Sequence, residues 1–145
     1  VYDVAIQNKE PDIPYMVGYT SEDIAPDQMR KAAVDWSLLL EQQGYHPAYV
    51  YCFSRDLPGE DMPVPEGGFG DMKGAFHSSE LWYMFGTLDK CWRPMEAADY
   101  ELSERMVSYW TNFAKSGNPN GADLPEWKPC TKADQHIQEL NVNRM

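Results

Sequence analysis

The alternation of apolar and polar stretches along the chain predicts a short series of strands and helices. An apolar run over 13–18 ends at a glycine and is typical of a buried strand, with Pro14 at its entry. A second run over 48–53 is mostly aromatic and apolar, which indicates a strand buried on both faces. A short stretch over 137–140 is a candidate for a third strand.

Helical periodicity marks two longer segments and one short one. Between 26 and 44 apolar residues recur every three or four positions, with Pro26 suited to the first turn and Gly44 to the end. A short, very aromatic helix is expected within 74–86. The clearest helix covers 97–115, and its apolar face is made by Leu102, Met106, Trp110 and Phe113.

Strands that alternate with helices predict an α/β fold, with parallel strands covered by helices. Two good strands make a poor sheet on their own, so we expect the chain to be the end of a larger α/β domain. The polar residues 1–12 are expected to be irregular. Residues 56–74 form a long loop with seven glycines and prolines before Gly74, and we predict that it is flexible.

Composition and charge narrow the function classes. The chain has 145 residues, enough for one domain, with 12 basic and 23 acidic side chains and a net charge of −11. This acidity argues against nucleic acid and anionic membranes as partners. The sequence has no apolar run long enough to span a bilayer and no basic segment leading into an apolar one. It begins at Val1, so we expect an N-terminal segment to be missing; a cytoplasmic location is favoured and secretion stays open.

The cysteines do not form a recognisable metal or disulfide pattern. Cys52, Cys91 and Cys130 are few and widely spaced, and reduced, partly buried thiols are the first expectation. One disulfide with one free thiol is the alternative. No phosphate-binding, dinucleotide-binding or zinc-protease motif occurs in the sequence.

Two features could carry chemistry. His77 follows a glycine-containing loop and precedes a short helix, a place where active sites of open α/β sheets gather, and it could act as a general base. A histidine hydrogen-bonded within the aromatic core is an equal alternative. Glu22 and Asp23 follow the first strand and could orient a histidine, although such pairs are more often solvated or cap a helix. No G-x-S-x-G motif occurs in the chain.

Several motifs together resemble the type-B carboxylesterases. The segment 74–86 reads GAFHSSELWYMFG, similar to the family's histidine segment, and 109–120 reads YWTNFAKSGNPN, similar to a family helix and its following turn. Trp127 matches the tryptophan that comes next. The segments 14–23 and 49–53 resemble the strand and loop of the catalytic acid and the strand before the histidine loop. Four motifs in the family's order make the resemblance specific.

The resemblance implies that the chain is the C-terminal part of an α/β-hydrolase, with the central sheet and the nucleophile elbow outside it. It further implies hydrolysis of carboxylic esters through an acyl-enzyme, in which His77 transfers the proton and Asp23 orients the His77 ring. Glu22 is the alternative acid. Glu80 is expected to tie its short helix to the loop without reacting. No metal or cofactor is implied.

Three departures from the family pattern bear on these roles. The family's acid is usually Glu, and its spacing from a strand-ending glycine, here Gly18, falls on Asp23. Only 53 residues separate Asp23 from His77, fewer than in many relatives, which implies a more open pocket. Ser78 stands where many relatives have glycine.

Partner expectations follow from the same reading. The full-length enzyme would take a small-molecule ester, whereas this chain alone would be inactive and would self-associate through the uncovered faces around Trp36 and Trp110. The alternative is a non-catalytic, cholinesterase-like interaction domain. A G-x-S-x-G motif upstream would support the enzyme, and its loss would support the interaction domain.

Overall fold

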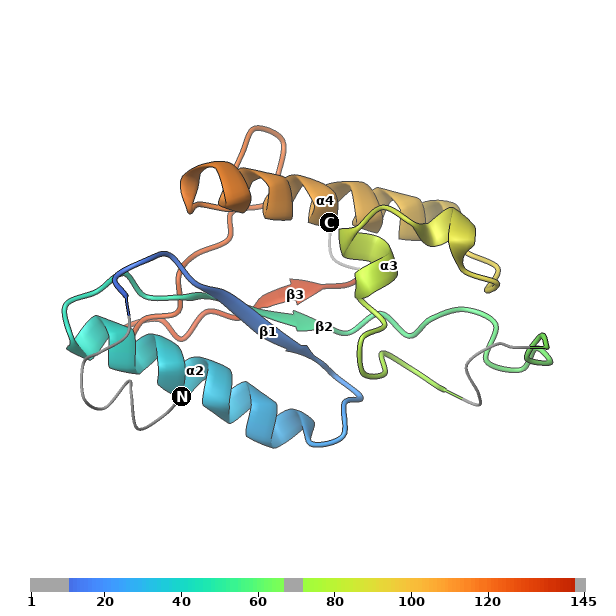
Figure 1. Cartoon of the computed structure of the whole chain (residues 1–145), viewed down its shortest axis with the longest axis horizontal. Helices are drawn as coiled ribbons and strands as arrows, with labels where there is room; N and C mark the ends of the chain where they lie inside the picture. Colours follow the sequence, from blue (N-terminus) through green and yellow to red (C-terminus); the bar gives the residue numbers. More distant parts are fainter. Residues whose placement is uncertain (1–10, 67–71, 143–145) are drawn as a thin grey trace.

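The computed structural model describes residues 11–66 and 72–142, and three parallel strands form its single sheet (Figure 1). The strands are β1 (Met16–Thr20), β2 (Tyr49–Phe53) and β3 (Gln138–Leu140), in the order β1-β2-β3. Helix α2 (Pro26–Gln42) lies on one face of the sheet and α4 (Ala97–Ser116) on the other. This arrangement confirms the predicted α/β class, with parallel strands between covering helices.

Two short helical segments connect β2 to α4. They are α3 (Leu81–Met84) and the single 3₁₀ turn η1 (Leu88–Lys90). Both lie at the same end of the molecule as the first residues of α4 (Figure 1). The predicted short aromatic helix is therefore present, but it covers four residues only.

The first strand differs from its predicted bounds. Ile13 lies outside β1 and is 49% exposed, and the strand continues beyond Gly18 to Thr20 because its pairing with β2 continues to Thr20 and Phe53. Gly18 is thus inside the strand. A Cβ there would lie 2.4 Å from the ring of Tyr51, so the ring occupies the space that any side chain at this position would need. The sequence predicts a strand end at Gly18, whereas close packing against Tyr51 is the reason for a glycine there.

The second strand and the two long helices are close to their predicted bounds. β2 is less buried than expected, since Tyr51 and Cys52 are half-buried within this chain. Helix α2 begins at Pro26 and ends at Gln42, two residues before Gly44. Helix α4 is followed by Gly117, which has a left-handed backbone conformation (φ 73°). A left-handed glycine after the last turn is a common helix end.

The core lies between the sheet and α4 and is organised around Trp127. This side chain is fully buried in the coil that follows α4. Its ring packs mostly edge to face, with centroids 5.2–6.2 Å away, against Tyr49, Tyr51, Tyr109 and Trp110. Aromatic pairs of this geometry add to the free energy gained by burial.

The helix faces around Trp36 and Trp110 are predicted to lack part of their cover, and both side chains are half-buried within this chain. Trp36 packs against Tyr15 with ring centroids 5.4 Å apart, and Trp110 packs against Tyr51 and Trp127. The exposed apolar side chains lie elsewhere, at Ile24, Leu81 and Phe85 among others. Association of the chain through these helix faces stays a prediction.

The long loop and the cysteines complete the comparison with the sequence. Residues 56–66 and 72–74 contain no helix or strand, whereas 67–71 and most of the predicted irregular segment 1–12 lie outside the described residues. Flexibility of the loop 56–74 stays a prediction. The three cysteines are unpaired, with Cys130 buried and the other two half-buried, in agreement with the first expectation.

Candidate active site

The segment that follows β1 lies beside the histidine segment at the carboxyl end of the sheet. Ser21 donates its backbone N–H to the carbonyl of Phe53 at 2.9 Å. Glu22 donates its backbone N–H to the carbonyl of Ala75 at 3.1 Å and forms a parallel bridge with Phe76. Backbone pairing between two distant segments thus brings residues 22–23 next to residues 75–77.

Asp23 and His77 lie within hydrogen-bond distance of each other. Nδ1 of His77 is 3.1 Å from Oδ2 and 3.2 Å from Oδ1 of Asp23. The Asp23 side chain is only 5% exposed, whereas that of His77 is 60% exposed. In the described part of the chain, Nε2 of His77 has no hydrogen-bond partner. One ring nitrogen is therefore held by a carboxylate while the other is open to solvent.

Further hydrogen bonds hold the Asp23 carboxylate in place. The Thr20 hydroxyl donates to Oδ2 at 3.2 Å, and the backbone N–H of Ile24 donates to Oδ1 at 2.7 Å. Burial raises the pKa of Asp23, but the hydrogen bonds from Ile24, His77 and Thr20 outweigh it and keep this pKa below its ordinary value. The group is therefore ionised at neutral pH and accepts hydrogen bonds only.

Glu22, the alternative acid, faces a different neighbour. A Cβ on Gly74 would lie 2.8 Å from Cδ of Glu22, so the Glu22 side chain lies directly against this glycine. Gly74 also has a left-handed backbone (φ 62°), and both conditions favour glycine there. No described hydrogen bond joins Glu22 to His77. Of the two adjacent carboxylates, the structure brings Asp23 to the histidine.

Glu80 lies behind this pair, at the start of α3. Burial raises the pKa of its carboxyl group, while the nearby His77 opposes this rise. Its Oε2 atom is buried, and the described part of the chain offers it no hydrogen-bond partner. Glu80 is thus close enough to influence the pair electrostatically, although no described bond connects it to either member.

Ser78, directly after the histidine, has a left-handed backbone with φ 67°. This conformation costs an L-residue about 1–2 kcal/mol, a cost that glycine does not have. The departure noted at this position therefore coincides with backbone strain next to His77.

A second carboxylate network, which the sequence reading missed, lies close to α3. Asp99 is fully buried and accepts hydrogen bonds from Arg55 Nε at 2.7 Å, Arg55 Nη2 at 3.1 Å and the Tyr83 hydroxyl at 2.7 Å. The backbone N–H of Glu96 also donates to it at 2.9 Å as part of a capping box. The only sequence signal was an acidic residue in the first turn of a helix, which does not reveal a buried ion pair.

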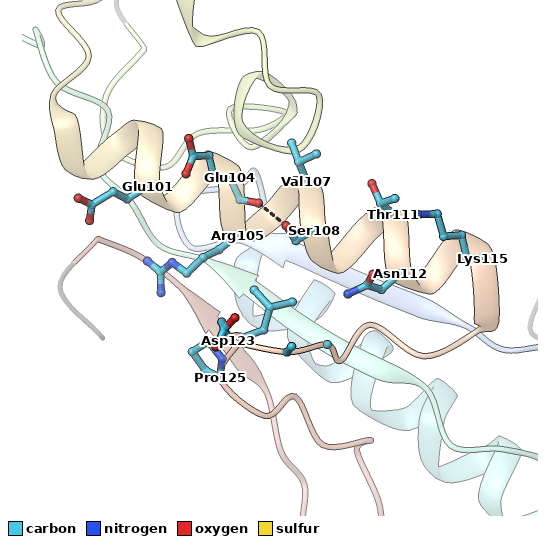
Figure 2. Close-up of a pocket in the computed structure, with 13 residues that line it drawn as sticks. Glu101, Glu104, Arg105, Val107, Ser108, Thr111, Asn112, Lys115, Asp123 and Pro125 are labelled. Carbon is cyan, nitrogen blue, oxygen red and sulfur yellow. Dashed lines mark hydrogen bonds between the residues drawn. The ribbon is translucent and has the colours of Figure 1, made fainter.

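A groove of about 810 Å³ lies between α4 and the segment 121–125 (Figure 2). Its lining includes neither His77 nor Asp23 and combines apolar side chains with exposed acidic and basic ones. On the α4 side the Ser108 hydroxyl donates to the carbonyl of Glu104 at 2.8 Å. The candidate catalytic pair thus lies on an open surface of the chain and not in this groove.

The described residues contain neither a metal-ligand cluster nor a membrane-spanning helix. No group of three or more His, Cys, Asp or Glu side chains there could hold a metal ion. None of the helices in residues 11–66 and 72–142 is long and apolar enough to cross a membrane. Among the remaining histidines, His46 is exposed, and His136 is half-buried beside Gln138 at 3.2 Å.

Comparison with known proteins identifies the family. Residues 2–145 match the sequence model of the Carboxylesterase family. Carboxylesterase 4A of Bos taurus is 32% identical over 104 residues, which are 68% of this chain and 18% of that protein. Bile salt-activated lipase of Rattus norvegicus is 34% identical over 96 residues, which are 64% of this chain and 14% of that protein. The chain thus spans less than a fifth of these relatives.

The fold is similar to that of solved esterases. A thermophilic PNB esterase superposes with a TM-score of 0.61 at 25% identity, over 82% of this chain and 23% of that one. A second PNB esterase gives a TM-score of 0.58 at 26% identity, over 82% of this chain and 22% of that one. The three parallel strands with their covering helices are therefore part of an α/β-hydrolase fold. On the sequence match and the fold together, the chain belongs to the carboxylesterase family.

Proposed function

We propose that this chain supplies the histidine and the acid of a carboxylic-ester hydrolase, with His77 as the proton-transferring base and Asp23 as its orienting carboxylate. The observation that supports this most is the asymmetry of the His77 ring. Nδ1 lies 3.1 Å from Asp23, while Nε2 faces solvent. An ester-cleaving triad needs a histidine held at one nitrogen and free at the other.

The proposed steps follow from this geometry. Asp23 fixes the tautomer in which Nδ1 carries the proton, so that Nε2 holds a free electron pair. Nε2 takes the proton from a serine hydroxyl as the serine oxygen attacks the ester carbonyl, and then gives it to the departing alcohol. In the second half, Nε2 takes a proton from water, which attacks the acyl-serine, and returns it to the serine. Asp23 stabilises the imidazolium in both halves.

The nearby acidic groups take supporting roles in this proposal. Glu80 keeps a buried carboxyl group behind the pair, and its charge would favour the imidazolium when His77 is protonated. Glu22 holds the backbone of the two segments together through its bonds with Ala75 and Phe76. Neither residue needs to touch the substrate. No metal or cofactor enters these steps.

The serine and the groups that stabilise the oxyanion would come from outside these 145 residues, since no G-x-S-x-G motif occurs in them. We therefore expect the chain alone to have no esterase activity. Purified chain with an activated phenyl ester should release phenol no faster than buffer. Turnover that a serine-directed organophosphate abolishes would contradict this expectation.

The direct test is a chimeric esterase. This chain replaces the segment that it matches in the thermophilic PNB esterase, and folded chimera is selected by circular dichroism and size exclusion. We expect hydrolysis of p-nitrophenyl acetate, and we expect His77→Ala to lower kcat by about 10³-fold or more. His46→Ala is the matched control, because that histidine is exposed and outside the pair. Equal kcat for the two variants would overturn the proposal.

A further inference from the structure

Arg93 is a buried arginine whose described hydrogen bonds all go to backbone carbonyls. It lies between η1 and α4 and is only 6% exposed. Its guanidinium donates to the carbonyls of Leu57 at 3.5 Å, Pro58 at 3.1 Å and Met72 at 2.5 Å. In the described part of the chain it forms no ion pair with a carboxylate. Arginines are rarely buried without a carboxylate, so the carbonyl contacts call for an explanation.

The three carbonyls belong to the two ends of the long glycine- and proline-rich loop. Leu57 and Pro58 begin it, and Met72 lies near its end. The same two ends are joined by the backbone bond from Leu57 N–H to the carbonyl of Gly74 at 3.3 Å, and the Gly74 N–H donates to the Glu60 carboxylate. Arg93 therefore closes the base of this loop, a set of contacts that we name the Arg93 clamp.

The Arg93 clamp also contacts the residue before the candidate base. The guanidinium carbon lies 5.6 Å from the ring centroid of Phe76 and 5.0 Å from that of Trp92. Cations at this distance from an aromatic face are attracted to it. Phe76 precedes His77 and bridges to Glu22, the residue before Asp23. A continuous set of contacts thus runs from Arg93 to both members of the pair.

We propose that Arg93 is a positioning residue for the proposed ester hydrolysis: it closes the loop base and supports Phe76, and it thereby keeps His77 against Asp23. This inference rests on the proposed function for its catalytic meaning. Arginine suits the task because its planar group carries five donors and stacks on rings. Lysine keeps the charge but has no planar fork, and methionine leaves three carbonyls without their donor.

The first test reads the His77 ring in the chain itself. With ¹⁵N-labelled histidine, ring nitrogen shifts report which nitrogen carries the proton in the neutral form. We expect wild type to hold the proton on Nδ1. Arg93→Met should lose most of this population while near-UV circular dichroism shows the fold intact. Arg93→Lys should keep an intermediate share. A folded Arg93→Met variant with an unchanged His77 tautomer would overturn the proposal.

A matched control variant distinguishes the loss of His77 positioning from the mere loss of a positive charge. Arg105 lies on α4 and also donates to a backbone carbonyl, that of Asn141 at 3.3 Å. Arg105→Met removes the same charge, and we expect it to leave the His77 tautomer unchanged. Equal loss of the Nδ1 proton in both variants would contradict a specific role for Arg93.

A second measurement needs no variant and decides the matter if Arg93→Met does not fold. Native-state hydrogen exchange follows the Leu57 N–H, at the loop base, and the Glu22 N–H, which bonds to Ala75. If the Arg93 clamp supports the histidine segment, the two amides open together, with the same protection and the same dependence on denaturant. Independent opening of the Glu22 amide at a protection more than tenfold different would overturn the proposal.

Neither measurement uses an ester. Failure of the chimeric esterase to depend on His77 would therefore remove the proposed function and leave the contact between Arg93 and the histidine segment standing. An unchanged His77 tautomer in Arg93→Met, together with an active and His77-dependent chimera, would remove this inference alone.

Discussion

Two aspartates of this chain have their pKa shifted in the same direction in very different surroundings. For Asp23 and Asp99 alike, burial raises the pKa and hydrogen bonds outweigh it, so both carboxyl groups stay ionised. Asp99 is fully buried and bonds to Arg55, which is always charged, and to Tyr83. Asp23 bonds to His77, which is mostly exposed and can gain or lose a proton.

The Asp99 and Asp23 sites differ in the side chain that bonds to the carboxylate and in how far that side chain is exposed to solvent. Around Asp99 every partner is fixed, and the network joins the segment that follows β2, α3 and the start of α4 through three side-chain bonds. Around Asp23 the histidine keeps one nitrogen open. A lowered carboxylate pKa therefore does not distinguish a structural site from a catalytic one. The distinguishing feature is whether the partner can exchange a proton with something outside the chain.

The open character of the Asp23 region should be visible first as self-association, which we propose for this chain. Ile24 and Phe85 are 89% and 68% exposed, and β1 pairs with a strand on one side only within the described residues. We expect a two-fold dimer with a micromolar dissociation constant, or about 8 kcal/mol. Sedimentation at about 5–50 μM, a range around a micromolar dissociation constant, measures it, and Phe85→Ser should weaken it. A monomer of 16.6 kDa without dye-accessible apolar surface would contradict the proposal.

Removing each carboxylate should separate the two regions next. Asp99→Ala leaves the Arg55 guanidinium without its partner, and we expect a loss of about 3–5 kcal/mol in the free energy of unfolding. Asp23→Ala should cost less than about 1.5 kcal/mol, because the exposed His77 can bond to water instead. Urea unfolding followed by tryptophan fluorescence compares the variants. A larger cost for Asp23 would reverse our assignment of the two regions.

The loss of stability in acid should also depend more on Asp99 than on Asp23. A lowered folded-state pKa adds stability above the unfolded-state pKa, near 3.8 for Asp, and this stability is lost as the pH falls through the folded-state pKa. We expect Asp99→Asn to flatten the fall in stability below about pH 4 more than Asp23→Asn does. The urea concentration at the unfolding midpoint, measured from about pH 2 to about pH 5, covers both sides of this pKa and provides the test. Equal flattening would show that the two networks contribute alike.

The smallest expected effect concerns the strained residue beside the base. Ser78→Gly removes the cost of a left-handed side-chain residue but increases the freedom of the unfolded chain, for a net gain of about 0.5–1 kcal/mol. Thermal unfolding should show a higher midpoint. Ser79→Gly is a suitable control, since Ser79 has no positive φ and should lose stability. A Ser78→Gly variant less stable than wild type would show that the serine side chain outweighs the strain.

The sequence predicted elements where one local pattern decided them. The helix over 97–115 carried its own apolar face and stop signal, and α4 differs by one residue. The end of the first strand was missed because pairing with β2, and not local composition, sets it. The strand over 137–140 had a weak pattern and forms because β2 offers it an edge.

The candidate site depended on information that spacing alone does not carry. Asp23 and His77 are 54 positions apart in sequence, and only the family resemblance connected them before the structure did. Nothing in the pattern around Asp99 or Arg93 indicated a buried charge, because one acidic or basic residue in a polar stretch reads as solvated. Buried polar networks form between distant segments, so they appear only once the chain is folded.

We propose that Asp23, and not its neighbour Glu22, orients His77 for catalysis. The measurement that tests it is kcat for Asp23→Asn and Glu22→Gln in the folded chimeric esterase, with the same activated ester. Asp23→Asn removes the acceptor of the Nδ1 proton, and we predict that it lowers kcat by about 10³–10⁴-fold. Glu22→Gln keeps the backbone pairing with Ala75 and should change kcat by less than about tenfold. The reverse ranking, or equal small effects, would contradict the account.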